Sequence, residues 1–367
     1  METIIPTPDS LPLPAPAWLL LFLLIFTFIL HVLFMNCLFG GTLVAAFSHF
    51  KGKRDPNHEQ LAKKIYSFMP PVIAFTVNLG VAPLLFVQVL YGHLIYSSSI
   101  LMAFAWFAVI PLLILGYYGA YLLRFRWEKL TETRTLITWL VAAIFAVIGF
   151  IYVNNLSLML RPETWADHYF QNPATGKLNW SDSQVYPRYL HFLLGAVAVS
   201  GLWIMIIGAR RKSGDASWSQ WTIAYGSKIF FYATAINIAA GLWLLLILPK
   251  RVMMIFMGEN MMATALFGVA FLLTIAVLFI IRKAGRIEDG RKLTYVGASH
   301  VLLILVFMAI MRELLRQAYL EPYFRLDQLP SEPQWTVFFI FVILLIIGLA
   351  VLGWMVTVVW KDKESPA

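Results

Sequence analysis

The sequence predicts an all-α membrane protein, a bundle of about nine transmembrane helices. Hydrophobic residues make up 60% of its 367 residues and charged residues only 13%, whereas a soluble domain normally carries about 25% charge. Apolar runs of roughly 20 residues or more recur along the chain, which is the length that a helix needs to cross a bilayer. Because there is too little polar surface to coat a soluble globule, a soluble enzyme is excluded.

Nine apolar runs are long enough to span, and a helix is the open-chain structure that crosses lipid with every backbone group hydrogen-bonded. They fall at approximately 17–45, 68–96, 100–123, 135–160, 187–209, 222–248, 261–281, 293–315 and 335–360. No Lys or Arg precedes the first run, so we expect a first span rather than a cleaved signal peptide. No shift in composition marks a second domain, and we expect a single transmembrane domain over residues 1–367.

The basic residues predict the orientation. The loops after the first, third, fifth and seventh runs, together with the C-terminal tail, contain 19 Lys and Arg residues, against 8 on the opposite side. Since cytoplasmic loops carry the excess of Lys and Arg, the N-terminus is expected outside and the C-terminus in the cytoplasm of a bacterial inner (plasma) membrane. The net charge of +9 is then explained by anionic lipid heads, and nucleic-acid binding is not expected.

The single cysteine, Cys37, lies in the first apolar run. One cysteine cannot form a disulfide within the chain, ligate an iron–sulfur cluster by itself or provide a C-x-x-C-H site for covalent haem. Any metal must therefore be held by His, Met, carboxylates or a partner subunit.

Ionisable residues inside a membrane are costly, which makes each of them a functional candidate. Four features stand out, namely His31, His191, His300 and the group Arg312, Glu313 and Arg316, while His93 lies at the outer end of the second run. A methionine group near the seventh run adds Met253, Met254, Met257, Met261 and Met262. Imidazole and thioether sulfur are axial ligands of low-spin haem iron. By topology His191 and the methionines open their helices at similar depth. The alternative is that the histidine bonds a neighbouring helix and that the methionines fill the core.

Arg312 and Arg316 are four residues apart and share one helix face. They can face outer water and lipid heads, or they can bind an anionic partner, either Glu313 or a haem propionate. Outside the runs, His49, His58 and His168 lie in or beside loops and are expected to be solvated. The prolines Pro70, Pro71 and Pro83 predict a distorted second helix.

The order of these features resembles the large subunit of the cytochrome bd quinol oxidases. Residues 30–34 (LHVLF) are similar to that family's first-helix histidine segment, and residues 75–83 (FTVNLGVAP) to its Asn-Phe-x-x-Gly-Val segment. Residues 188–191 (RYLH) lead into a Gly/Ala-rich fifth helix, where the family keeps its low-spin haem histidine. The resemblance is best from about residue 20 to 210 and implies nine spans with an external N-terminus.

The resemblance also implies ligands. His191 is expected as an axial ligand of a low-spin b haem, with one of Met257, Met261 and Met262 as its partner. His31 matches a histidine that ligates a second haem. For the family's high-spin haem ligand in the eighth helix, Glu313 and His300 are the two candidates.

Two departures from the family affect the expected activity. The third run has no Glu, although the family has two there near its oxygen-reducing haems, and the connection from Pro249 to Asn260 replaces a large quinol-binding loop. We therefore expect a b-type cytochrome subunit with one to three b haems. It would carry electrons between the quinone pool and an external c-type cytochrome or similar protein, together with other membrane subunits. The alternatives are a bd-type quinol:oxygen oxidase subunit and a haem-free, quinone-interacting anchor of a reductase.

Overall fold

The computed structural model describes residues 6–8, 11–171, 177–210 and 216–362. Within these residues, nine helices are long and apolar enough to cross a membrane. They are α1 (Ala17–Gly52), α2 (Pro56–Leu101), α3 (Ala103–Phe125), α4 (Arg134–Met159), α6 (Val185–Ala209), α7 (Ala216–Ile247), α9 (Met261–Ala284), α10 (Arg291–Leu320) and α11 (Trp335–Asp362). The predicted all-α class and the nine spans are confirmed.

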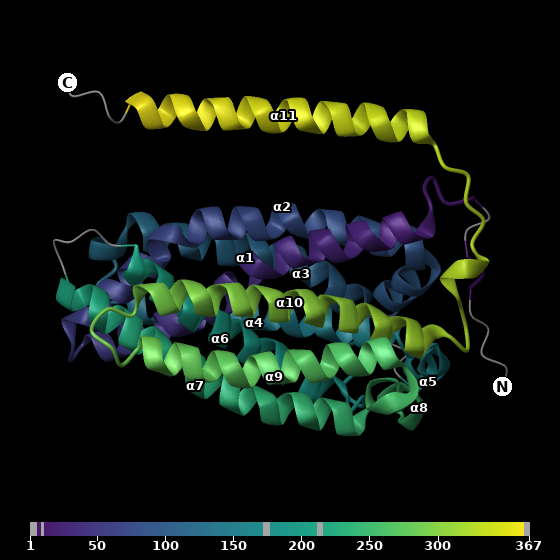
Figure 1. Ribbon diagram of the computed structural model, residues 1–367, viewed down its shortest axis with the longest axis horizontal. Coiled ribbons are helices and arrows are strands. Elements are labelled where there is room, and N and C mark those ends of the chain that lie inside the picture. Colours follow the sequence, from purple (N-terminus) through teal and green to yellow (C-terminus); the bar gives the residue numbers. More distant parts are fainter. Residues whose placement is uncertain (1–5, 9–10, 172–176, 211–215, 363–367) are drawn as a thin grey trace.

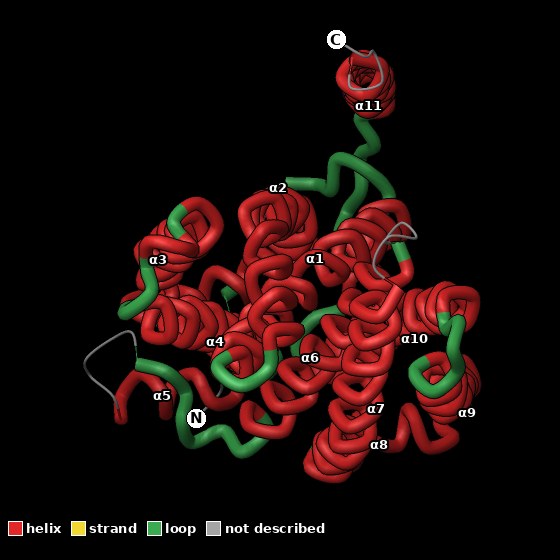
Figure 2. Tube along the Cα trace, turned by 90° about the vertical axis from the view of Figure 1, so that its left-hand side faces the viewer, coloured by secondary structure: helices red, strands yellow, loops and turns green. Residues whose placement is uncertain are grey.

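The helices run back and forth along one direction, so that α1 begins at one end of the bundle and α11 ends at the other (Figure 1). Viewed end-on, α1, α4 and α6 form the centre, α3 lies at one side, and α9 and α10 lie at the other (Figure 2). The loops with most Lys and Arg therefore share one end, which we call the basic end. Arg211, Lys212 and Lys363, which are among the 19 basic residues counted from the sequence, lie outside the described residues.

Short elements close the other end. They are α5 (Trp165–Gln171), α8 (Lys250–Met254), the 3-10 turns Pro162–Thr164 and Leu326–Gln328, and a π turn at Ile255–Glu259, while the 3-10 turn Trp127–Lys129 lies at the basic end. In the π turn Gly258 has φ +124°, a conformation that side chains with a Cβ rarely adopt. The chain can thus reverse into α9 without a large loop.

Helix α2 has 46 residues, about 69 Å at the rise of an α-helix, so it extends well beyond a hydrocarbon core of about 30 Å. Asp55 caps it by accepting a hydrogen bond from the backbone N of Asn57 at 2.9 Å. The predicted distortion is present, but the non-helical residue is Tyr91 (φ −134°, ψ 30°) and not one of the prolines. This break is close to the candidate site described below.

Helices α6 and α7 approach closely through small residues, as membrane helices do. A Cβ on Gly226 would lie 2.5 Å from the backbone O of Gly201. By contrast, α11 stands apart from the bundle (Figures 1 and 2). The segment before it is held by the N-terminal chain, where the backbone N of Leu13 donates to Pro330 O at 2.8 Å and that of Glu332 donates to Leu13 O at 2.9 Å.

Candidate functional site

A buried carboxylate is the centre of the candidate site. Glu313 is the only Asp or Glu in the nine predicted runs, and it is 5% exposed. Tyr91 Oη donates to Glu313 Oε1 at 2.5 Å, and Arg316 Nη1 donates to Oε2 at 2.7 Å. Arg316 is itself 3% exposed, so this pair faces neither water nor lipid heads. The sequence allows outer water, lipid heads, a haem propionate or Glu313 as the partner of Arg312 and Arg316. For Arg316 the partner is Glu313.

Tyr91, the residue at the break in α2, contacts both members of this pair. Tyr91 is 1% exposed, and the guanidinium of Arg316 lies over its ring, 5.1 Å from the centroid. A buried charge is tolerated when it is paired and hydrogen-bonded. The hydroxyl and the guanidinium together meet that requirement for Glu313.

Two further arginines near Glu313 have no carboxylate of their own. Arg312 lies over the ring of Phe28 at 4.5 Å and within electrostatic range of Arg316 and Arg188. Arg188 donates to Gln184 Oε1 at 3.5 Å. Both arginines are half-buried, and within the described chain neither forms an ion pair. The cluster thus carries excess positive charge, which an anionic ligand would neutralise.

His31 and His191 present the same nitrogen to a neighbouring helix. His31 Nδ1 lies 2.9 Å from Thr76 O, and His191 Nδ1 lies 3.3 Å from Asn237 O. A backbone carbonyl only accepts, so in a neutral imidazole Nδ1 carries the proton and Nε2 keeps its lone pair. Metal-ligating histidines are typically oriented in this way by a carbonyl. The alternative, in which such a histidine bonds a neighbouring helix, therefore also agrees with these two contacts.

A glycine lies against each ring. A Cβ on Gly80 would be 2.8 Å from His31 Cε1, and one on Gly241 would be 3.0 Å from His191 Cε1. On α7, Asn237, whose carbonyl contacts His191, and Thr234, three residues earlier, have buried side-chain oxygens with no hydrogen-bond partner within the described part of the chain. Buried polar atoms usually have partners, so these two can serve a ligand near His191.

The other predicted ligands are placed differently. His300 Nδ1 bonds Val296 O of its own helix at 2.8 Å, and we find no cross-helix hydrogen bond for it within the described segments. Met257, Met261 and Met262 lie in the π turn and at the start of α9, with exposures of 43%, 87% and 56%. Their role as the second axial ligand stays a prediction.

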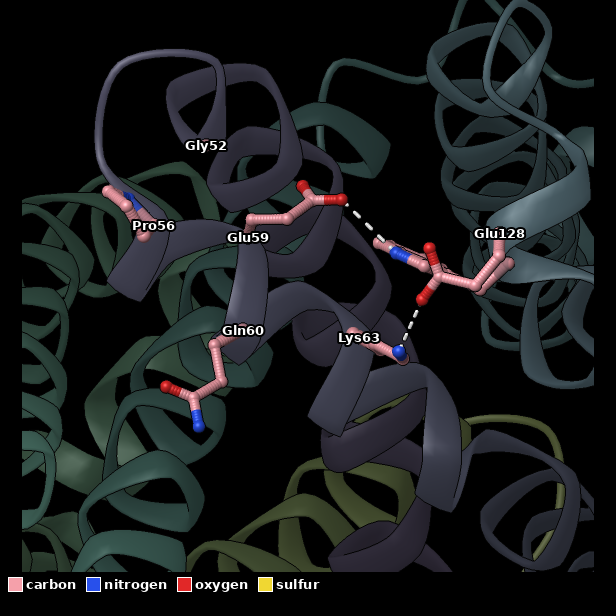
Figure 3. Close-up of a pocket in the computed structure, with 7 residues that line it drawn as sticks. Gly52, Pro56, Glu59, Gln60, Lys63 and Glu128 are labelled. Atoms are coloured by element: carbon pink, nitrogen blue, oxygen red, sulfur yellow. Dashed lines mark hydrogen bonds and ion pairs between the residues drawn. The ribbon is translucent and has the colours of Figure 1, made fainter. Parts of the chain in front are cut away.

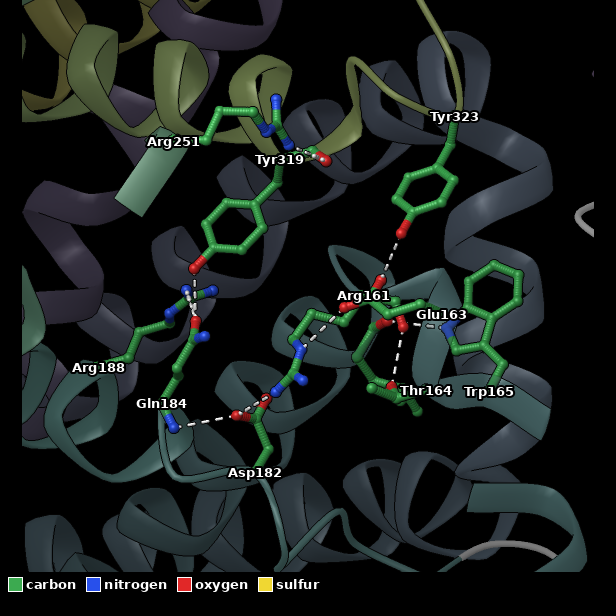
Figure 4. A network of polar contacts seen from close by, with 11 residues as sticks. Arg161, Glu163, Thr164, Trp165, Asp182, Gln184, Arg188, Arg251, Tyr319 and Tyr323 are labelled. Atoms are coloured by element: carbon green, nitrogen blue, oxygen red, sulfur yellow. Dashed lines mark hydrogen bonds and ion pairs between the residues drawn. The ribbon is translucent and has the colours of Figure 1, made fainter. Parts of the chain in front are cut away.

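The non-basic end of the bundle is covered by a polar network from the loop after α4 (Figure 4). Arg161 donates to Asp182 Oδ1 at 2.9 Å, and Tyr319 Oη donates to Gln184 Oε1 at 2.5 Å. Burial lowers the pKa of Arg161, but the carboxylates of Asp182 and Glu163 outweigh burial and raise it above its usual value.

The prediction that His49 is solvated is wrong, because His49 is 7% exposed. At the basic end, Glu59 Oε2 lies 2.6 Å from His49 Nδ1, and Arg134 Nη1 donates to Glu59 Oε1 at 2.6 Å. The His58 side chain is 12% exposed and packs edge-on against Tyr225 with ring centroids 4.6 Å apart. These residues connect α1, α2, α4 and α7, and the contacts of Glu59 with His49 and Arg134 satisfy the polar groups buried there.

No family model and no curated protein sequence matches this chain. A solved bd oxidase from Geobacillus thermodenitrificans matches with a TM-score of 0.69 and 13% sequence identity, over 97% of this chain and 100% of that chain. This chain has the fold of a bd oxidase chain. The likeness found in the sequence is thereby confirmed as a shared architecture.

Sequence reasoning missed three contributors to the site. Tyr91 and Gln184 reach it only through tertiary contacts, and neither stands out in its local sequence. Arg188 did carry a signal, because it precedes His191 by three residues and so lies on the same side of α6.

Proposed function

We propose that this chain is a b-type cytochrome subunit of a respiratory complex related to the bd oxidases. It would carry electrons between the quinone pool and an external redox partner such as a c-type cytochrome. The observation that supports the proposal best is the pair of intramembrane histidines whose Nδ1 atoms are committed to backbone carbonyls, which leaves Nε2 of each able to bind iron.

The residues present fit a haem in three respects. His191 and His31 each offer an imidazole Nε2, Gly241 and Gly80 let the rings pack closely against the neighbouring helices, and Arg312 lies within electrostatic range of His31. A bound b haem would supply a one-electron redox centre. The proposed ligands are His191 with one of Met257, Met261 and Met262 for the low-spin b haem. His31 is the proposed ligand of a second haem, and Glu313 or His300 that of a high-spin haem.

The chain's own residues have distinct tasks in this proposal. Arg188 and Arg312 would bind the carboxylates at the edge of the cofactor, since neither has an ion pair among the described residues. Tyr91 donates its hydroxyl proton to Glu313 Oε1, and Arg316 orients that carboxylate through its hydrogen bond to Oε2. The outer network around Arg161 would exclude water.

The proposed external partner depends on topology. We propose that the basic end faces the cytoplasm, as expected from the distribution of Lys and Arg, in a bacterial inner membrane. His191 lies in the second turn of α6, close to the opposite face, and the exposed methionines lie at that end too. Electron exchange with a protein outside would then cross a short distance.

The direct test is a reduced-minus-oxidised spectrum of the purified complex with pyridine haemochrome typing, followed by reduction with a soluble quinol. The proposal expects b haem that the quinol reduces. Absence of haem, together with binding of quinone, would favour the haem-free anchor instead.

A working quinol:oxygen oxidase is the second candidate. Glu313, buried in the eighth span, occupies the helix in which the resembling family places a carboxylate on its high-spin haem. Against it, α3 carries no Asp or Glu, and α7 and α9 are joined by a short turn. Oxygen uptake by the purified complex separates the two candidates.

A further inference from the structure

Two neighbouring cavities at the basic end differ in charge. The first, of about 450 Å³, includes the carboxylates Glu59 and Glu128 in its lining, and Lys63 is paired with Glu128 there (Figure 3). The second, of about 620 Å³, shares Lys63 and Gln60 with it but has no carboxylate among its lining residues. The second cavity is therefore the one suited to an anion.

Helices α2 and α3 and the residue that follows α6 each present a cation to the second cavity. Lys64, Arg124 and Arg210 are exposed and line it, and no described residue forms an ion pair with any of the three. Lys64 Nζ lies 5.0 Å from the ring centroid of Phe68. Because these three side chains are exposed and form no ion pair with a described residue, they can bind an anion.

Apolar side chains line the same cavity farther from the helix ends. Phe68 follows Lys64 by one turn of α2, and Trp203 precedes Arg210 by two turns of α6. The rings of Phe68 and Trp203 meet with centroids 6.0 Å apart, and Ile206 and Ile207 complete the apolar wall. The cavity is thus charged toward the end of the bundle and apolar toward the membrane interior.

We propose that this cavity binds an anionic phospholipid, with the phosphodiester held by Lys64, Arg124 and Arg210 and an acyl chain lying against Phe68 and Trp203. A free phosphate would use the cations but not the apolar wall. Basic pockets between transmembrane helices suit acidic lipid head groups, and each Lys or Arg near the membrane surface contributes about 1 kcal/mol to such binding. The proposal is independent of haem and of the direction of electron flow.

The test compares phosphatidylglycerol with phosphatidylcholine, titrated into the full-length protein in detergent and followed by native mass spectrometry. Lys64→Gln with Arg210→Gln removes two of the three cations. Lys53→Gln with Lys283→Gln, at exposed positions of the same end outside the cavity, is the matched control. Circular dichroism and gel filtration confirm that both variants are folded.

Wild type is expected to retain phosphatidylglycerol over phosphatidylcholine. The cavity variant should lose affinity for phosphatidylglycerol roughly 20- to 30-fold, the equivalent of about 2 kcal/mol, while the control stays within a few-fold of wild type. Equal losses in both variants would mean general surface charge and overturn the proposal. So would equal retention of the two lipids by wild type, or displacement of the lipid by millimolar inorganic phosphate.

Discussion

Removing the carboxylate of Glu313 should destabilise the protein strongly. In Glu313→Ala, Arg316 keeps its charge at 3% exposure without a counter-ion, and the hydroxyl of Tyr91 loses its acceptor at 2.5 Å. Breaking a buried pair by removing one partner costs about 3–5 kcal/mol, and we expect the free energy of unfolding to fall by that amount. Tyr91→Phe, which removes only a hydrogen bond to a charged group, should cost about 1.5–3 kcal/mol.

The matched control is Glu321→Ala, near the C-terminal end of α10. Glu321 pairs with Arg251 at 3.1 Å, but the two side chains are 61% and 45% exposed. An exposed pair of this kind contributes about 0–1 kcal/mol. The two variants therefore separate a buried ion pair from a solvated one on neighbouring stretches of the chain.

The assay is equilibrium unfolding in mixed detergent–dodecyl sulfate micelles, followed by far-UV circular dichroism, with haem content measured in parallel. The double variant Tyr91→Phe with Glu313→Ala should cost less than the sum of the single changes, because both act on one interaction. Additive costs, or a Glu313→Ala variant no less stable than Glu321→Ala, would refute the argument that this carboxylate is buried and paired.

Three further outcomes are expected. A reporter fused after Ala367 should be active only in the cytoplasm, and periplasmic activity would rule out the nine-span orientation. Purified complex should consume little oxygen with a soluble quinol, since α3 has no carboxylate to carry protons; rapid turnover would restore the oxidase hypothesis. Burial lowers the pKa of His168, so the unfolded chain binds the proton more tightly, and stability should fall as the pH drops below about 6.5. His168→Gln should flatten that decline in a thermal-unfolding series, and an unchanged slope would show that His168 does not contribute.

The helices could be predicted because each depends on local composition. An apolar run of about 20 residues determines a span whatever its neighbours are. The first turns of α2, from Pro56 to Ser67, escaped prediction because they are polar and lie before the apolar run. Their helical state depends on the Asp55 cap and on the contacts of Glu59 with Arg134 and His49.

The site was only partly predictable for a related reason. Polarity within apolar runs was enough to single out His31, His191 and Glu313 as candidates. Their partners depend on which helices touch, since Tyr91 and Glu313 are 222 residues apart in sequence, and His191 and Asn237 are 46 apart. His49 was misjudged because its nearness to a loop suggested solvent, whereas its carboxylate and hydroxyl partners come from α2 and α4.

The proposed function depends most on His191 as an iron ligand, and the haem spectrum of an alanine variant tests this role. Reduced-minus-oxidised spectra of wild type, His191→Ala and the control His168→Ala are recorded at equal protein concentration. Since the nine apolar spans still drive insertion, His191→Ala should reach the membrane in normal amount. We expect it to lose one b-haem signal that wild type and His168→Ala both retain. An unchanged haem content in His191→Ala would contradict the account.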